Sequence, residues 1–183
     1  MDESNINIDN IFKLCETAIF IDHTNIDLFA KYHSSLSNSK KRVRIRIDLR
    51  FLMAQICVNK KIIYKSVAGS FNLRNKNYKK DNRLHNEEDI YKELGFNIIA
   101  SQIKGKKETH IDGAIANDII NFSKFNPLAE IIVLSGDINE NKYGISIEEA
   151  IQIAKQNGNK VERYGFEGMN CDQVINENCL FKY

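Results

Sequence analysis

The fold of this chain is decided by the stretch Ile131-Ile132-Val133-Leu134-Ser135-Gly136-Asp137, an apolar run that ends in a carboxylate. An earlier stretch, Ala18-Ile19-Phe20-Ile21-Asp22, has the same form. Short apolar runs bounded by polar residues predict strands that are covered on both faces, as in parallel sheets. If both runs are parallel strands, Asp22 and Asp137 emerge at one edge of the sheet, where open α/β folds bind their ligands.

Strand and helix patterns alternate along the rest of the chain. We expect strands at 61–68 (stopped by Gly69), 96–103 and 160–165, and helices at 43–58, 86–95, 111–123 and from the cap Ser146 to Gly158. We expect one domain over 1–183, with a lead-in at 1–16 and a tail at 167–183 that holds a last helix through Val174 and Ile175. The predicted fold is a three-layer α/β sandwich around a mainly parallel, Rossmannoid sheet of four to six strands.

Composition is typical of a water-soluble globular domain, with 43% hydrophobic and 27% charged residues among 183. No apolar run approaches the length of a membrane span, and the first residues lack the order of a signal peptide, so we expect a cytoplasmic protein without membrane contact. The four cysteines form no Cys-x-x-Cys pair, and the histidines show no zinc spacing. Reduced, mostly buried thiols are therefore expected.

Charge is divided unevenly along the chain. Residues 40–107 hold 18 Lys and Arg against 6 Asp and Glu, a net charge of +12, while the rest holds 8 against 18, a net charge of −10. A basic middle beside an acidic remainder suits a polyanionic substrate together with a metal site. A solvated face without a partner remains the alternative.

Several motifs in this chain resemble those of one family. The first is Phe20-Ile21-Asp22-His23-Thr24-Asn25, with an Asp, two variable residues and an Asn. It resembles the strand-one signature of the NYN domain, a branch of the PIN-like ribonucleases. Four further motifs follow in the order that the family shows. They are a second-helix opening (46–50), a basic loop with an acidic helix (106–118), a Ser-Gly-Asp strand end (133–137) and a glycine before a strand (158–162). The resemblance runs from about 17 to 166 and implies a PIN-like fold, a nuclease and an RNA substrate.

One position departs from the family's pattern. A second Asp usually stands two residues after Ser-Gly-Asp, and here that residue is Asn139, followed by Glu140. Ser146 is the aligned residue instead if the stretch after Asp137 is longer than usual. Glu140, Glu148 or Glu149 are candidates to replace the missing acid; otherwise the site binds metal more weakly or has lost catalysis.

The expected site is a Mg²⁺ or Mn²⁺ centre, because these ions prefer hard oxygen ligands. Asp22, Asp112 and Asp137 form the expected ligand core, and Asn25 orients Asp22 or a water. Asp118 is the weaker fourth candidate, because residues six apart on a helix lie about 120° from each other. Singly, Asp22 or Asp137 is as well explained by a turn or a helix cap.

Substrate contacts are expected from the basic loops. The candidates for gripping a phosphate backbone are Lys104, Lys106, Lys107, Arg74, Lys79 and Lys80. Phe71 and Tyr78 either stack on unpaired bases or anchor a loop to the core. His23 and His110 are expected to support the acids or to lie on the surface, since this chemistry does not require a histidine.

The function expected from these features is metal-dependent phosphodiester cleavage, with RNA favoured over DNA by the resemblance alone. The main alternative is a catalytically weak or inactive nucleic-acid-binding module with the same fold, which Asn139 favours. A phosphatase is a third reading, but no second Asp follows Asp22 by two residues, and there is no Gly-rich phosphate loop. The oligomeric state, including a homo-oligomer, is left open by the sequence.

Overall fold

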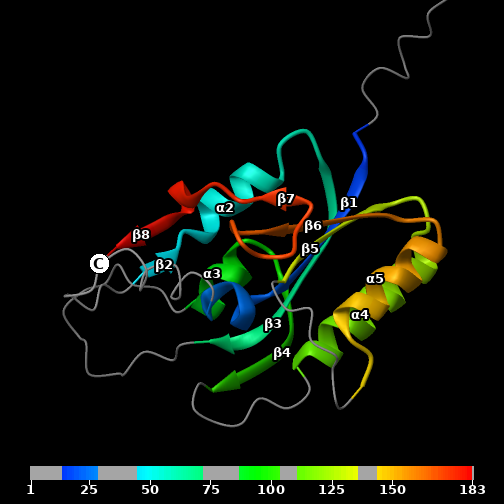
Figure 1. Ribbon diagram of the computed structural model, residues 1–183, viewed down its shortest axis with the longest axis horizontal. Helices are drawn as coiled ribbons and strands as arrows, with labels where there is room; N and C mark the ends of the chain where they lie inside the picture. The colour runs from blue at the N-terminus through cyan, green and yellow to red at the C-terminus, as the bar shows by residue number, and fades with distance from the viewer. Residues whose placement is uncertain (1–13, 29–44, 72–86, 104–110, 136–143, 183) are drawn as a thin grey trace, which may run out of the picture.

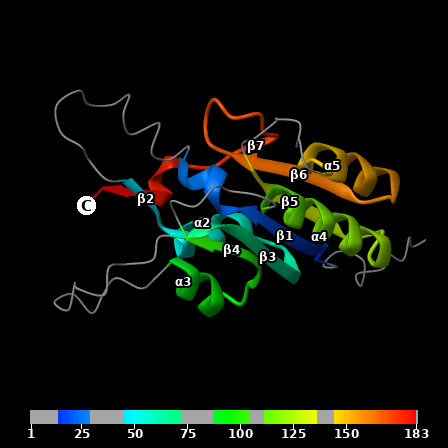
Figure 2. The ribbon, with the colours of Figure 1, turned by 90° about the horizontal axis from the view of Figure 1, so that it is seen from below.

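The protein is a three-layer α/β sandwich (Figures 1 and 2). The structure, a computed structural model, describes residues 14–28, 45–71, 87–103, 111–135 and 144–182. The central sheet contains β1 (Glu16–Asp22), β3 (Lys61–Phe71), β4 (Asn97–Ile103), β5 (Glu130–Leu134), β6 (Lys160–Gly165) and β7 (Gln173–Val174). The helices are α2 (Leu49–Ile56), α3 (Glu87–Glu93), α4 (Ile111–Phe125) and α5 (Ile147–Gln156), and residues 23–28 are also helical.

The sheet is doubly wound. Its strand order is β4-β3-β1-β5-β6-β7, and every adjacent pair is parallel. The chain moves outward from β1 through β3 to β4, then returns across β1 to β5 and moves outward the other way. The order therefore reverses between β1 and β5, and a crevice is expected there, outside the carboxyl ends of the two strands. The predicted parallel α/β fold is confirmed.

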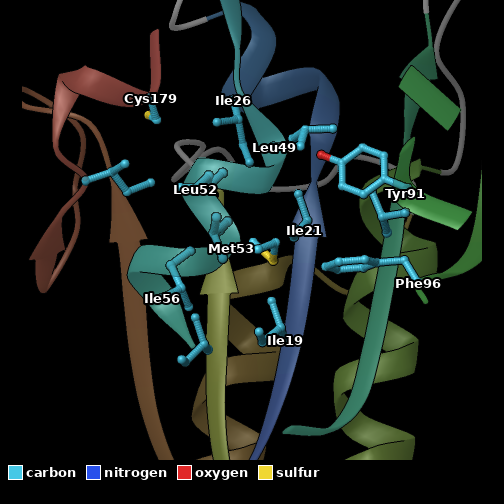
Figure 3. Close-up of a cluster of buried hydrophobic side chains, with 14 of the residues drawn as sticks. Ile19, Ile21, Ile26, Leu49, Leu52, Met53, Ile56, Tyr91, Phe96 and Cys179 are labelled. Atoms are coloured by element: carbon cyan, nitrogen blue, oxygen red, sulfur yellow. The ribbon is translucent and has the colours of Figure 1, made fainter. Parts of the chain in front are cut away.

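Two apolar clusters hold the layers together. Ile19 and Ile21 face the cluster under α2 and α3, which Figure 3 shows, while Ala18 and Phe20 face α4 and α5. The alternation follows from the two-residue period of a strand. All four side chains are 0% exposed, which explains why this strand contains no polar residue until Thr17 on one side and Asp22 on the other.

The predicted helix at 43–58 is wrong in its first part. Asp48 caps α2, because its side chain accepts from the backbone N–H groups of Arg50 and Phe51. Ile45–Ile47 instead forms the strand β2, which pairs antiparallel with β8 (Leu180–Lys182). Ile45 stands four residues before Leu49, a spacing that extends the helical pattern, and only the pairing with β8 makes this segment a strand.

Two further expectations from the sequence are wrong: the end of β3 and the helix in the tail of the chain. Gly69 does not stop β3, which continues to Phe71 and pairs with β4 to that point. The expected last helix through Val174 and Ile175 is absent from 171–182: Val174 belongs to β7, and a 3₁₀ turn follows at Glu177–Cys179. This part of the chain is integrated into the fold, because Ile175 is 3% exposed and joins the α2 cluster.

The helix cap, the cysteines and the lengths of the helices bear on three more expectations. Ser146 caps α5 in a capping box with Glu149, as predicted. All four cysteines are free thiols, but only Cys179 is buried, so the expectation of mostly buried thiols is wrong. Across the described ranges, no helix has the length and apolarity that a membrane crossing requires.

Candidate functional site

Asp22 lies at the carboxyl end of the central strand β1 and is 0% exposed. Its Oδ1 accepts from the backbone N–H of Asn25 at 3.1 Å, and its Oδ2 accepts from the Asn25 side-chain amide at 2.7 Å. The backbone bond is that of an N-cap for the helical residues 23–28. The side-chain bond orients the second carboxylate oxygen, so Asn25 holds Asp22 as expected from the sequence.

The same asparagine reaches across to β5. Asn25 Nδ2 is 3.4 Å from the hydroxyl oxygen of Ser135, which follows β5 and is 4% exposed. Ile21 and Leu134 are register partners, so Asp22 and Ser135 stand side by side at the point where the strand order reverses. In the sequence, Ser135 stands out only as part of the Ser-Gly-Asp strand end, because its contact with Asn25 depends on the pairing of β1 with β5.

The two other expected core ligands are only partly visible. Asp112 lies in the first turn of α4, which leads from β4 back to β5 and therefore begins on the side of the strands' carboxyl ends. Its side chain, like all of Asp137, lies outside the described residues. Within the described residues, no group of three or more His, Cys, Asp or Glu side chains could hold a metal ion. Convergence of Asp22, Asp112 and Asp137 therefore stays a prediction.

Asp118 is held elsewhere. Both of its carboxylate oxygens accept from the Tyr64 hydroxyl, at 3.0 and 3.1 Å. Tyr64 is the register partner of Ala18, four residues before Asp22, which corresponds to about 13 Å of strand. The Tyr64 ring packs against Phe20 and Phe122, which also contact each other, under α4. The structure thus gives Asp118 a partner inside the layer between α4 and the sheet.

Basic side chains in the described part of the middle region already have partners. Arg50 pairs with Glu93, Lys60 with Glu130, Lys61 with Glu16 at 2.7 Å and Lys92 with Glu88 at 2.7 Å, and Lys65 donates to the Leu94 carbonyl. The six expected phosphate contacts at Arg74, Lys79, Lys80, Lys104, Lys106 and Lys107 lie outside the described residues. The strands that precede these segments in the sequence, β3 and β4, end at Phe71 and Ile103, at the same edge of the sheet as Asp22.

His23, the residue after Asp22, does not lie on the surface but belongs to a buried group of polar side chains. His23 is 2% exposed, and its two ring nitrogens contact Tyr91 and Glu87. Asp27 is also buried, at 5%. Glu87 lies in the first turn of α3 and is 7% exposed, and the sequence contains no local signal that would bury it. Phe71 is 1% exposed and stacks on His23, so it anchors β3 and does not stack on bases; Tyr78 and His110 lie outside the described residues.

Fold and site together define a doubly wound α/β protein with a buried carboxylate at the switch point of its sheet. The model of the NYN domain matches residues 16–179, nearly the whole chain. The chain therefore belongs to the NYN domain family, which is a PIN-like nuclease family. No curated protein and no solved structure matches the chain.

Proposed function

We propose that this protein is a metal-dependent ribonuclease that cleaves phosphodiester bonds at the carboxyl edge of its sheet. The observation that carries the proposal is the buried Asp22, oriented by Asn25 beside Ser135 at the reversal of strand order. Burying a carboxylate is costly unless it is hydrogen-bonded or coordinates a metal. Asp22 is hydrogen-bonded and also stands at the switch point of the sheet, where folds of this kind bind their ligands, and this position supports a role in the site.

The residues present fit a hard divalent ion. Asp22 supplies carboxylate oxygens and Ser135 a hydroxyl oxygen, which is the donor chemistry that Mg²⁺ and Mn²⁺ prefer. We propose Asp22, Asp112 and Asp137 as the protein ligands and leave Asp118 out, because Tyr64 holds it. When bound, such an ion lowers the pKa of a water and neutralises charge on the phosphate under attack.

The other proposed site residues would orient Asp22 or bind the nucleic-acid substrate. Asn25 keeps the Asp22 carboxylate in one orientation through its 2.7 Å bond. The loop lysines Lys104, Lys106 and Lys107, with Arg74, Lys79 and Lys80, would contact the phosphate backbone. Phosphate contacts position a substrate without reading its sequence, so little sequence preference is expected from them. The preference for RNA rests on the family.

The experiment is incubation of labelled single-stranded RNA and DNA with the protein in Mn²⁺, Mg²⁺ or EDTA. Asp22→Asn keeps a good helix cap but removes the charge, so it should lose cleavage and remain folded. Asp172→Asn is the matched control, since Asp172 is an exposed carboxylate that accepts from the Arg163 N–H at 2.8 Å. Cleavage by Asp22→Asn at the wild-type rate would assign the activity to another site or to a contaminant.

A second function is favoured by Asn139. An NYN domain that lacks one acid of its usual set could bind nucleic acid without cutting it. In that case the wild-type protein binds RNA through the same loops, and no metal ion makes it cleave.

A further inference from the structure

His23, the residue after Asp22, joins the turn at the end of β1 to two other elements. Its Nδ1 is 3.1 Å from the Tyr91 hydroxyl oxygen, and its Nε2 is 3.2 Å from a carboxylate oxygen of Glu87, both on α3. Its ring stacks on Phe71, the last residue of β3, with centroids 5.0 Å apart and planes at 20°. Both ring nitrogens and one ring face are therefore engaged.

The chemistry of the partners limits the direction of the two hydrogen bonds. A carboxylate at Glu87 can only accept, so Nε2–H donates to it, whereas the Tyr91 hydroxyl can either donate to Nδ1 or accept from Nδ1–H. Burial, and then the charges of Glu87, Asp27 and Asp22, raise the pKa of Tyr91 well above its ordinary value. The phenol thus keeps its proton, and Figure 3 shows its hydroxyl directed toward β1.

The opposite side of the turn is equally tight. A Cβ at Gly69 would lie 2.7 Å from His23 Cβ and 3.1 Å from the Thr24 nitrogen. The backbone N–H of Ser70 donates to Thr24 Oγ1 at 2.8 Å. The turn that carries Asp22 therefore packs directly on the backbone of β3, and only a residue without a side chain admits this approach.

We propose that His23 is a positioning residue, which holds the turn bearing Asp22 and Asn25 between α3 and β3. Phe71 and Glu87 are also the described residues on either side of 72–86, a stretch with five Lys and Arg. His23 therefore links Asp22 to the two described residues that flank this basic stretch in the sequence. The catalytic consequence rests on the proposed function, whereas the positioning itself does not.

The positioning is tested without activity by NMR of the ¹⁵N-labelled protein. The reporter is the side-chain amide of Asn25, assigned by its loss in Asn25→Ala, because this amide bonds Asp22. Tyr91→Phe removes one hydroxyl and Gly69→Ala crowds the other side, so both should shift the Asn25 signal. Glu87→Gln keeps an acceptor for Nε2–H and should restore most of the wild-type signal relative to Glu87→Ala.

Ser123→Ala is the matched control. Ser123 Oγ is a buried hydroxyl in the last turns of α4, and it accepts from the Asn157 side chain at 2.8 Å. Ser123→Ala should lower the free energy of unfolding as Tyr91→Phe does, but it should leave the Asn25 side-chain signal at its wild-type position. An Asn25 signal that stays at its wild-type position in both Tyr91→Phe and Gly69→Ala overturns the proposal.

Kinetics on RNA add the second readout. Tyr91→Phe should lower kcat by about tenfold with KM within about twofold of wild type, less than the roughly hundredfold that a 1 Å displacement can cost. A kcat equal to that of Ser123→Ala overturns the catalytic part. If the wild type cleaves neither RNA nor DNA, the proposed function fails, and the Asn25 signal still decides whether His23 positions the turn.

Discussion

Replacing Lys104, Lys106 and Lys107 together with alanine should weaken RNA binding and flatten its salt dependence. The choice of these lysines follows from the partners of the other bases in the +12 region. The described bases between Arg50 and Lys92 pair with acids or a carbonyl. The stretches 29–44, 72–86 and 104–110, which include Lys104, Lys106 and Lys107, hold 13 Lys and Arg against 2 acids, a charge that attracts a polyanion.

The size of the effect follows from counterion release. Each phosphate contact on a single strand contributes about 0.7 to the slope of log affinity against log salt, so three lost contacts lower the slope by about 2. Between about 50 and about 200 mM salt, the wild type should then lose about fifteenfold more affinity than the variant does. Fluorescence anisotropy of a labelled RNA in EDTA measures both slopes without cleavage.

The control removes the same charge elsewhere. Arg50, Lys61 and Lys92 are each more than half exposed, and each pairs with a glutamate. Replacing these three with alanine should change the slope by less than a third as much. Equal slopes in the two triple variants would mean that RNA responds only to net charge, and an unchanged affinity in the loop variant would make that loop solvated surface.

Two further predictions concern the metal site and the far edge of the sheet. Wild-type cleavage should need metal in about the millimolar range, and Asn139→Asp should lower the concentration that gives half-maximal cleavage, because it restores a carboxylate ligand. If both proteins bind RNA and DNA normally but cut neither at high Mn²⁺, the binding-module reading replaces the nuclease. Burial alone would raise the pKa of Glu130, but hydrogen bonds from Lys60 and Lys160 outweigh it and hold that pKa below its usual value. A carboxyl group whose pKa is lowered by folding stabilises the fold at pH values above its unfolded pKa of about 4.3. This stabilisation is lost as pH falls through the pKa of the folded state. The free energy of unfolding, measured with urea, should therefore be higher for the wild type than for Glu130→Gln at neutral pH, and this difference should shrink below about pH 4. A difference that stays the same at all pH values would contradict the pairing of Glu130 with Lys60 and Lys160.

Much of the fold was predictable because its signals are local. The run from Ala18 to Ile21 is apolar on both faces, and strands buried on both faces are typically near-continuous apolar runs of this kind. The Ser146 cap and the glycine after α5 are read within a single turn of helix. Strands that alternate with helices then leave a parallel sheet as the simplest arrangement, and the strand-end acids indicate which edge to examine.

Other features depend on residues that are distant in sequence. β2 forms only because β8 returns to pair with it, so no window around Ile45–Ile47 could reveal it. Asp118 was a reasonable candidate by spacing, and Tyr64, 54 residues away, gives it a different partner.

By itself, the sequence determined a three-layer α/β fold with a mainly parallel sheet and acids at its strand ends, since apolar runs, caps and strand-helix alternation are local properties. Only the tertiary structure decided which residues surround Asp22. The pairing of β1 with β5 brings Asn25 to Ser135, 110 residues away, and the packing of α3 buries Glu87 and Tyr91 against His23, 64 and 68 residues away. Such contacts are set by strand order and helix packing, which depend on burial of the whole core and leave no mark in a short stretch of sequence.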